Sequence, residues 1–160
     1  MEKASSAAPG STAIIEPATW RDLNALRNLE QICFPQDVWP LFDLIGVLTF
    51  PGVVRLKATY AGTMVGFISA DIRRHENVAW ISTVGVLPEF RRQGLGSRLL
   101  LTCEEHLPVS QIRLSVRASN NPAIQMYTRY GYKQYGVWKR YYSDGEDALV
   151  LEKHAVGFGL

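Results

Sequence analysis

The chain has 160 residues, 47% of them hydrophobic, and its 17 Lys and Arg nearly balance its 15 Asp and Glu. This length predicts one domain, and a net charge of +2 argues against a broad nucleic-acid-binding surface. No apolar run reaches the roughly 18 residues that a membrane-spanning helix needs. Two cysteines are too few for a disulfide framework. We therefore expect a cytoplasmic globular protein that binds neither nucleic acid nor a membrane and that holds no metal.

The two ends of the chain differ in composition from the rest. Residues 1–12, MEKASSAAPGST, are small and polar and lack the apolar segment of a signal peptide, so they are predicted to form a disordered arm. Residues 13–154 are predicted to form the domain, followed by a short tail at 155–160.

Hydrophobic periodicity and turn residues divide the first half of the domain. Thr19, with Asp22 three places later, is a shortened capping box that predicts a helix start. Phe34-Pro35 ends that helix, and Pro40 opens the next one. The predicted elements are a strand at 13–16, helices at 20–33 and 40–48, and strands at 53–60, 64–72 and 78–86.

The second half continues the alternation. Its predicted elements are a helix at 94–107, a strand at 111–116, a helix at 122–130, and strands at 132–142 and 148–153. The complete order, β-α-α-β-β-β-α-β-α-β-β, predicts an α/β (α+β) fold with one mixed sheet covered by helices on both faces.

Residues 84–97, V-G-V-L-P-E-F-R-R-Q-G-L-G-S, place a strand end, a basic turn and a helix start in succession. A helix start carries unpaired N–H groups and the positive end of the helix dipole, and two glycines let a phosphate approach the backbone. The stretch therefore predicts a site for the pyrophosphate of a nucleotide-bearing cofactor. Its candidate ligands are Arg91, Arg92, Gln93, Gly94, Leu95, Gly96 and Ser97.

Two common phosphate-binding motifs do not fit this stretch. It lacks the G-x-x-x-x-G-K-[ST] of a P-loop, and Leu99 occupies the place of the third glycine of G-x-G-x-x-G. The pattern that fits is R-x-x-G-x-G, from Arg91 to Gly96, which resembles the acetyl-CoA-binding motif of the GNAT superfamily of N-acetyltransferases.

A second motif makes the resemblance more specific. Residues 114–131 read L-S-V-R-A-S-N-N-P-A-I-Q-M-Y-T-R-Y-G, and residues 140–148 read R-Y-Y-S-D-G-E-D-A. Both stretches resemble RimI-type GNAT enzymes, which acetylate the N-terminal alanine of a ribosomal protein. The resemblance is strong over residues 78–153 and is limited to the order of elements over residues 13–50.

The resemblance implies the GNAT fold, acetyl-CoA as the cofactor, and roles for individual residues. Val84 and Val86 would bind pantetheine and the acetyl carbonyl through their backbones, where their strand separates from the next one. Asn120 would contact pantetheine, and it is also a natural helix N-cap. Tyr127 would protonate the departing CoA thiolate, although a helical Tyr can equally be a core residue.

One position departs from the family. RimI-type enzymes carry a glutamate as general base two residues before the Arg of V-R-A-S-N, and this chain has Ser115 there. A serine hydroxyl can hold a relay water but does not accept an amine proton at neutral pH. Glu30, Asp71, His75 and Glu76 are possible substitutes, each with the alternative of a solvated charge or a structural ion pair, and Thr83 could order a relay water.

The acceptor side of the site is the least specified by the sequence. Phe34 and Tyr141 are our candidate acceptor-binding residues, while Glu146 and Asp147 could instead attract the ammonium group. We expect direct transfer of an acetyl group to the α-amine of a protein N-terminus, in a monomer or homodimer. The alternatives are a small-molecule amine or antibiotic acetyltransferase and a non-catalytic CoA-binding protein.

Overall fold

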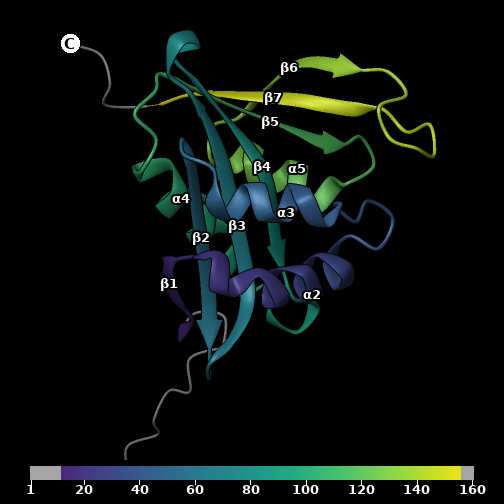
Figure 1. Cartoon of the computed structure of the whole chain (residues 1–160). Coiled ribbons are helices and arrows are strands. Elements are labelled where there is room, and N and C mark those ends of the chain that lie inside the picture. Colours follow the sequence, from purple (N-terminus) through teal and green to yellow (C-terminus); the bar gives the residue numbers. More distant parts are fainter. Residues whose placement is uncertain (1–11, 156–160) are drawn as a thin grey trace, which may run out of the picture.

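A computed structural model describes residues 12–155 and shows a seven-stranded mixed sheet in the order β1-β2-β3-β4-β5-β7-β6 (Figure 1). All neighbouring strands are antiparallel except β4 and β5, which are parallel. The strands are β1 (Ile14–Pro17), β2 (Val53–Tyr60), β3 (Thr63–Arg73), β4 (Val78–Val86), β5 (Gln111–Arg117), β6 (Lys133–Trp138) and β7 (Ala148–His154). The helices are α2 (Leu23–Cys33), α3 (Leu41–Thr49), α4 (Leu95–Glu105) and α5 (Asn121–Arg129), with 3-10 turns η1 (Trp20–Asp22), η2 (Arg74–Glu76) and η3 (Pro88–Phe90).

The helices cover the two faces of the sheet in pairs, with α2 and α3 in front and α4 and α5 behind in Figure 1. Each pair buries its own hydrophobic cluster against the strands. The front cluster includes Leu26 and Leu29 of α2 with Phe67 of β3, and the rear cluster includes Leu99 of α4 with Ile68 of β3. Successive residues of β3 therefore point to opposite layers, as the pleat of a strand requires.

Local sequence explains how several elements begin and end. Ala61 and Gly62 join β2 to β3 with φ of 49° and 78°, the left-handed pair of a tight hairpin turn. Thr19 accepts a hydrogen bond from the Arg21 N–H, and Asp22 accepts one from the Thr19 N–H, so the predicted cap is present.

A β-bulge in β4 changes which side chains face which layer. Ile81 pairs with Ala70 and Thr83 pairs with Ser69, so Ser82 is an extra residue with no partner on β3. Before the bulge, Ile81 packs into the rear cluster, whereas after it Val84 and Val86 do so. Thr83 and Gly85 consequently face α2 in front.

Close approach of α2 to this part of β4 depends on a glycine. A Cβ at Gly85 would lie 2.9 Å from Leu29 Cδ2 and 3.3 Å from Phe34 Cε2, closer than packed carbon atoms come. The helix thus rests directly on the β4 backbone, and its side chains reach the strand residues on either side.

Beyond the bulge, β4 and β5 separate. Their ladder consists of four pairs, from Val78 with Gln111 to Ile81 with Leu114, and ends there. Both strands continue, β4 to Val86 and β5 to Arg117, each paired only on its other side. A wedge-shaped gap therefore opens in the middle of the sheet.

The predicted order of elements and the mixed α/β sheet are confirmed. The largest difference concerns the strand expected at 132–142, because β6 ends at Trp138. Arg140 has a φ of 51° and donates its N–H to the Asp147 carboxylate, so the chain turns away and leaves Tyr141 and Tyr142 in a loop. Residues 1–11 of the predicted arm and 156–160 of the predicted tail lie outside the described residues.

Candidate active site

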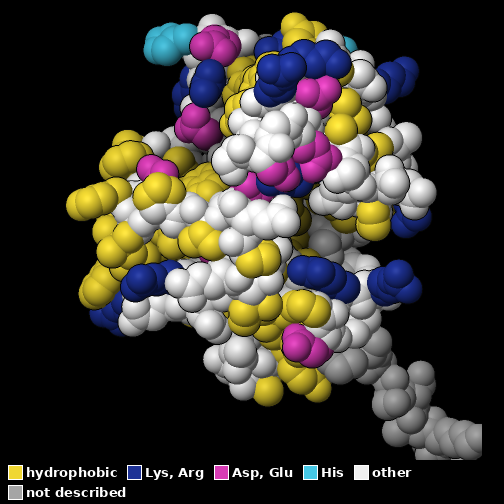
Figure 2. Space-filling view, turned by 90° about the vertical axis from the view of Figure 1, so that its right-hand side faces the viewer, with side chains coloured by type: hydrophobic (Ala, Val, Ile, Leu, Met, Phe, Trp, Pro, Cys, Tyr) yellow, Lys and Arg dark blue, Asp and Glu magenta, His cyan; other side chains and the backbone are white. Residues whose placement is uncertain are grey.

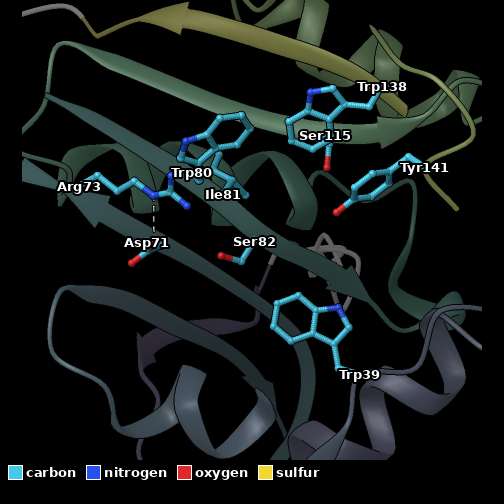
Figure 3. Close-up of a pocket in the computed structure, with 9 residues that line it drawn as sticks. All are labelled: Trp39, Asp71, Arg73, Trp80, Ile81, Ser82, Ser115, Trp138 and Tyr141. Atoms are coloured by element: carbon cyan, nitrogen blue, oxygen red, sulfur yellow. Dashed lines mark hydrogen bonds and ion pairs between the residues drawn. The ribbon is translucent and has the colours of Figure 1, made fainter. Parts of the chain in front are cut away.

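A cavity of about 350 Å³ lies at the gap between β4 and β5 (Figure 3). Ser82 comes from β4 and Ser115 from β5, so the two hydroxyl-bearing residues stand on the two strands that separate. The other lining residues come from β3, β4, the segment after α2, and the end of β6 with its following loop: Trp39, Asp71, Arg73, Trp80, Ile81, Trp138 and Tyr141.

Aromatic rings form most of the cavity wall. Trp80 and Trp138 stack with centroids 5.6 Å apart, and Trp138 lies 5.0 Å from Tyr141. Tyr141, which was predicted to bind the acceptor, is among the residues that line the cavity. Phe34 does not line the cavity but packs near Gly85, and Trp39 from the same segment takes the cavity position.

Trp80 and Trp138 at this cavity were not among the predicted site residues, whereas Trp39 belongs to the same segment as Phe34, which was predicted to line the acceptor side. Trp80 and Trp138 come from two separate strands, and each alone resembles an ordinary half-buried aromatic residue. Only the pairing of Trp80 on β4 with Trp138 on β6, across β5 and β7, brings them together.

The polar groups around the cavity are few. Asp71 and Arg73 of β3 form an ion pair of 3.5 Å with both side chains about half exposed. Ser115 is partly exposed and lines the cavity, so its hydroxyl is accessible to a bound molecule. The alternative expected for Asp71, a structural pair, is what the structure contains. His75 and Glu76 lie in η2 and line a different hollow.

The basic turn leads into α4 as predicted. Gly94 has a φ of 79° and no heavy atom within 4 Å of a Cβ position, so the backbone there is open to a ligand. Arg92, with a φ of 59°, is exposed beside it. The side chain of Leu95 is buried in the core, which leaves only its N–H for a ligand. Free N–H groups, a cationic side chain and an open glycine suit a pyrophosphate.

Arg91 is placed differently from Arg92. Its Nε donates to the Val86 carbonyl at 2.8 Å, and the Cys33 thiol donates to the same oxygen at 3.4 Å. Arg91 was expected to bind phosphate, and the β4 backbone at Val86 was expected to bind pantetheine. In the structure the two are instead bonded to each other. Both thiols are poor nucleophiles here, because burial raises the pKa of Cys33 and raises that of Cys103 to about 12.

Tyr127 lies near the end of α5 with 7% of its surface exposed. Its ring meets that of Tyr132 edge-on, with centroids 5.6 Å apart. Burial raises the pKa of Tyr127 above its ordinary value, with a smaller contribution from Tyr142. The phenol is therefore protonated at neutral pH, as a proton donor must be, although it is a weaker acid than a free tyrosine.

Asn120 caps α5, because its Oδ1 accepts a hydrogen bond from the Ala123 N–H at 3.3 Å. The structural role considered for this residue is therefore present. Its side chain is exposed, so the amide nitrogen faces solvent and is available to a ligand.

Arg117 of β5 connects the two loops beside the cavity. Its guanidinium donates two hydrogen bonds to Asp37, at 3.0 and 2.9 Å, and one each to Asp144 and Glu146. It also stacks over the Tyr142 ring at 4.1 Å. Figure 2 shows acidic side chains gathered around a basic one in the middle of this face. We call these residues the Arg117 clamp.

The clamp corrects one expectation. Glu146 was a candidate for attracting the substrate ammonium, but its carboxylate is occupied by Arg117 and by the Ser119 N–H. Asp147 is likewise occupied, by Lys139 and the Arg140 N–H. Arg117 is the Arg of the V-R-A-S-N motif, and it was not a predicted site residue. Its contacts with three carboxylates could not be predicted, because those carboxylates belong to loops that are far apart in the sequence.

Glu30 was considered as a substitute base, with a solvated charge or a structural ion pair as the alternative. The alternative does not hold, because Glu30 is 1% exposed and has no cationic partner in the described part of the chain. Its Oε1 accepts a hydrogen bond from Thr83 Oγ1 at 3.1 Å. Its place on the apolar stripe with Leu26 and Leu29 was the sequence signal that could have indicated burial.

Within residues 12–155, no helix is both long and apolar enough to cross a bilayer. The same residues contain no group of three or more His, Cys, Asp or Glu side chains placed to hold a metal ion.

Comparisons with known proteins agree with this geometry. The model of the Acetyltransferase (GNAT) family matches residues 23–132. The catalytic subunit NAA10 of the Arabidopsis thaliana N-terminal acetyltransferase A complex is 31% identical over 150 residues, covering 89% of this chain and 78% of that one. A putative [ribosomal protein bS18]-alanine N-acetyltransferase of Bacillus subtilis is 38% identical over 78 residues, covering 46% of this chain and 51% of that one.

A solved structure supports the same assignment. The ribosomal-protein-S18-alanine N-acetyltransferase from Escherichia coli superposes with a TM-score of 0.83 at 27% identity, covering 92% of this chain and 97% of that one. The family match spans the basic turn, the separated strands and Tyr127. The chain therefore belongs to the GNAT family and is an acetyl-CoA-dependent acetyltransferase.

Proposed function

We propose that this enzyme acetylates the α-amine of protein N-termini. The observation that carries the proposal is the gap between β4 and β5, because the cavity lies at this gap on one face of the sheet and α4 packs on the other face. An amine entering the cavity would meet a thioester delivered from the other side. The matches to acetyltransferases whose names specify N-termini and N-terminal alanine support this choice of acceptor.

Acetyl-CoA, when bound, supplies an acetyl group activated as a thioester. In the proposal the N–H groups at the start of α4 and the Arg92 side chain hold its phosphates. Backbone groups of β4 around Val84, which have no partner on β5, hold the acyl end. For Val86 to take part, Arg91 must release its carbonyl, which also frees the Arg91 charge for the phosphates.

Tyr127 is the proposed proton donor to the leaving thiolate. Burial favours the protonated phenol, and the same dry surroundings also raise the basicity of a thiolate beside it. Ser115, at the other edge of the gap, is placed to hydrogen-bond the entering amine or a water molecule, and Tyr141 to contact the acceptor backbone.

The acceptor class follows from the cost of removing a proton. An α-amine with a pKa near 7.8 is about one-quarter neutral at pH 7.4, whereas a lysine amine near 10.4 is about 0.1% neutral. The difference is roughly 3.4 kcal/mol in favour of the α-amine. A site that has Ser115 in place of the family glutamate therefore suits α-amines better than lysine side chains.

The test is acetyl-CoA-dependent release of free thiol with a matched set of acceptors. The set contains peptides with free Ala, Ser and Met N-termini, the same peptides with a blocked N-terminus and one internal lysine, free amino acids, and polyamines. We expect turnover on free N-termini and at least about 100-fold less on the lysine peptides, following their difference in neutral fraction.

Faster turnover on lysine, amino acids or polyamines than on N-termini would overturn the proposed acceptor class. Mass spectrometry of the products locates the acetyl group on the α-amine or elsewhere. The predicted cytoplasmic location and the monomeric or homodimeric state stay predictions from the sequence.

A further inference from the structure

Two buried polar side chains and one partly buried one lie together between α2 and the sheet. Glu30 of α2 is 1% exposed and Ser69 of β3 is 0% exposed, while Thr83 of β4 stands directly across from Ser69. Glu30 Oε2 and Ser69 Oγ have no hydrogen-bond partner among the described residues. A buried carboxylate with one oxygen unpaired is costly, so its presence calls for a reason other than stability.

The bulge connects this cluster to the cavity. Ser82 lines the cavity, and Thr83 is the next residue along β4. In a regular strand with Ser82 paired normally, Thr83 would face α4 as Ile81 does, and its hydroxyl would not reach Glu30. The close packing of α2 on Gly85 then brings Glu30 to 3.1 Å from the Thr83 hydroxyl.

We propose that Glu30 accepts the proton of the acceptor ammonium through the hydroxyl of Thr83. The inference rests on the proposed function, since it identifies the base that a site lacking the family glutamate needs. It assigns the base to α2, on the opposite side of β4 from β5, where Ser115 lies.

The proton moves in two linked transfers. The N–H bond of the ammonium breaks, its electron pair stays on nitrogen, and the proton binds Thr83 Oγ1. At the same time the O–H bond of Thr83 breaks and its proton binds Glu30 Oε1, along the hydrogen bond present in the structure. The amine becomes neutral and the carboxylate becomes a carboxylic acid, which passes its proton through Thr83 to solvent water once the acetylated product has left.

The surroundings of Glu30 favour this role. Burial raises the pKa of Glu30, which brings it closer to that of an α-amine, and the Thr83 hydrogen bond opposes the shift only in part. Cys33, on the same helix, has its pKa raised in part by the Glu30 charge. Further charged groups on elements packed against α2, or just beyond them, are Asp22 paired with Lys57, Asp43 on α3, Asp71 paired with Arg73, and Arg91 after β4.

The decisive experiment is the pH dependence of kcat for Glu30→Gln, which keeps the size of the side chain and an oxygen for Thr83. Without a base the variant uses only acceptor that is already neutral, about 5% of an α-amine at pH 6.5 and about 95% at pH 9. We therefore expect a loss of up to roughly 20-fold at pH 6.5 that disappears by pH 9.

Variants of the two hydroxyls complete the test. Thr83→Val should show the same pH-dependent loss, and Thr83→Ser, which restores a hydroxyl, should recover most of the activity. Ser69→Ala removes a hydroxyl from the same buried cluster that is not bonded to Glu30, and its profile should match the wild type. Stabilisation by acetyl-CoA in a thermal melt should be the same in all variants, which shows that the cofactor site is intact.

A loss in Glu30→Gln that is the same at every pH would overturn the inference and make Glu30 structural. Equal activity of Thr83→Val and wild type would also overturn it. The acceptor used is whichever amine the wild type acetylates best, and the loss should follow the pKa of that amine. If the proposed acceptor class is wrong, the loss of kcat in Glu30→Gln still depends on pH, but its midpoint follows the pKa of a different amine. If Glu30 is not the base, the loss does not depend on pH.

Discussion

Tyr127 and Tyr132 are neighbours in the core, yet their hydroxyls have different surroundings. Tyr132 donates to Glu104 Oε1 at 2.9 Å, and Lys153 binds the same carboxylate at 2.8 Å. Tyr127 has its proposed role at the gap between β4 and β5. Two residues of the same type, with rings 5.6 Å apart, therefore serve as controls for each other.

We expect Tyr127→Phe to lower kcat by about 10²-fold or more, within the range for loss of a general acid, and to leave the Kd of acetyl-CoA nearly unchanged. Tyr132→Phe should keep kcat and lose about 1–3 kcal/mol of unfolding free energy, because the Glu104 carboxylate loses a buried donor. Steady-state kinetics and urea unfolding measure the two effects. A fall in kcat for Tyr132→Phe as large as that for Tyr127→Phe would contradict the assignment.

Single residues also mark the limit of what the sequence could predict. The glycines and arginines before α4 and the motif around Tyr127 were recognisable because their spacing is local. The burial of Glu30 was not recognised, although Glu30 lies on the stripe with Leu26 and Leu29, because a glutamate is rarely fully buried without a charged partner. Thr83 depends on the bulge, which the sequence does not mark because residues 78–81, V-A-W-I, show no alternation of hydrophobic and polar residues that an extra residue could interrupt.

At the scale of elements, the Arg117 clamp joins β5 to two loops that form opposite walls of the cavity. Asp37 belongs to the segment that carries Trp39, and Asp144 and Glu146 belong to the loop that carries Tyr141. Aromatic residues on loops contact a substrate at a fixed distance only if the loops themselves are held. The clamp therefore acts on acceptor binding without touching the acceptor.

We expect Arg117→Met to raise the KM for the acceptor by about tenfold, equivalent to roughly 1.4 kcal/mol, and to leave the KM for acetyl-CoA unchanged. Its partners are three carboxylates, so the variant leaves like charges facing one another. A parallel rise in both KM values would show instead that the whole site has loosened.

The same variant has a pH signature. Hydrogen bonds to the Glu146 backbone and to Arg117 lower the pKa of Asp144, and those to Ser119 and Arg117 lower the pKa of Glu146. Lowered folded-state pKa values contribute stability above the unfolded values of 3.8 and 4.5, and this stability is lost as the pH falls through the folded values. The difference in Tm between wild type and Arg117→Met should therefore be constant from pH 8 to 5 and should shrink towards pH 3.

The order of the helices and strands could be predicted from the sequence more fully than the contacts between them. Turn residues and periodicity gave β2 and β4 their observed bounds, and the family motifs placed α4 and α5. The end of β6 was missed because the left-handed Arg140 is held by Asp147, a contact that closes only when the loop forms. Trp80 and Trp138 were missed for a similar reason, since they lie on the central strand β4 and the edge strand β6, which are far apart in the sequence.

At the scale of the whole molecule, the proposed cofactor and acceptor sites lie on opposite faces of one sheet. A ligand that bridges them should stabilise the fold as a unit. With acetyl-CoA at 100 times its Kd, we expect about 2.7 kcal/mol of added stability and a rise in Tm of roughly 5–10 °C, measured by calorimetry or dye fluorescence.

Gly96→Ala is the matched variant for this measurement. A Cβ at Gly96 would lie 3.4 Å from Met126 Sδ, a contact that a flexible side chain can relieve, and alanine favours a helix over glycine by up to about 1 kcal/mol. The Tm without ligand should therefore hold or rise, while the shift with acetyl-CoA should fall. An unchanged shift would mean that the pyrophosphate lies away from the start of α4.

The short ladder between β4 and β5 also bears on the order in which the protein folds. The strands from β2 to β4 are connected by tight turns and can pair early, whereas Val78 and Gln111 lie about 33 residues apart and must close a loop that contains α4. We therefore expect the two halves of the sheet to meet late, at the seam where the reacting groups gather. A nascent chain would then form the antiparallel sheet from β2 to β4 before β5 completes both the rear core and the active site, so a partly folded enzyme would be inactive.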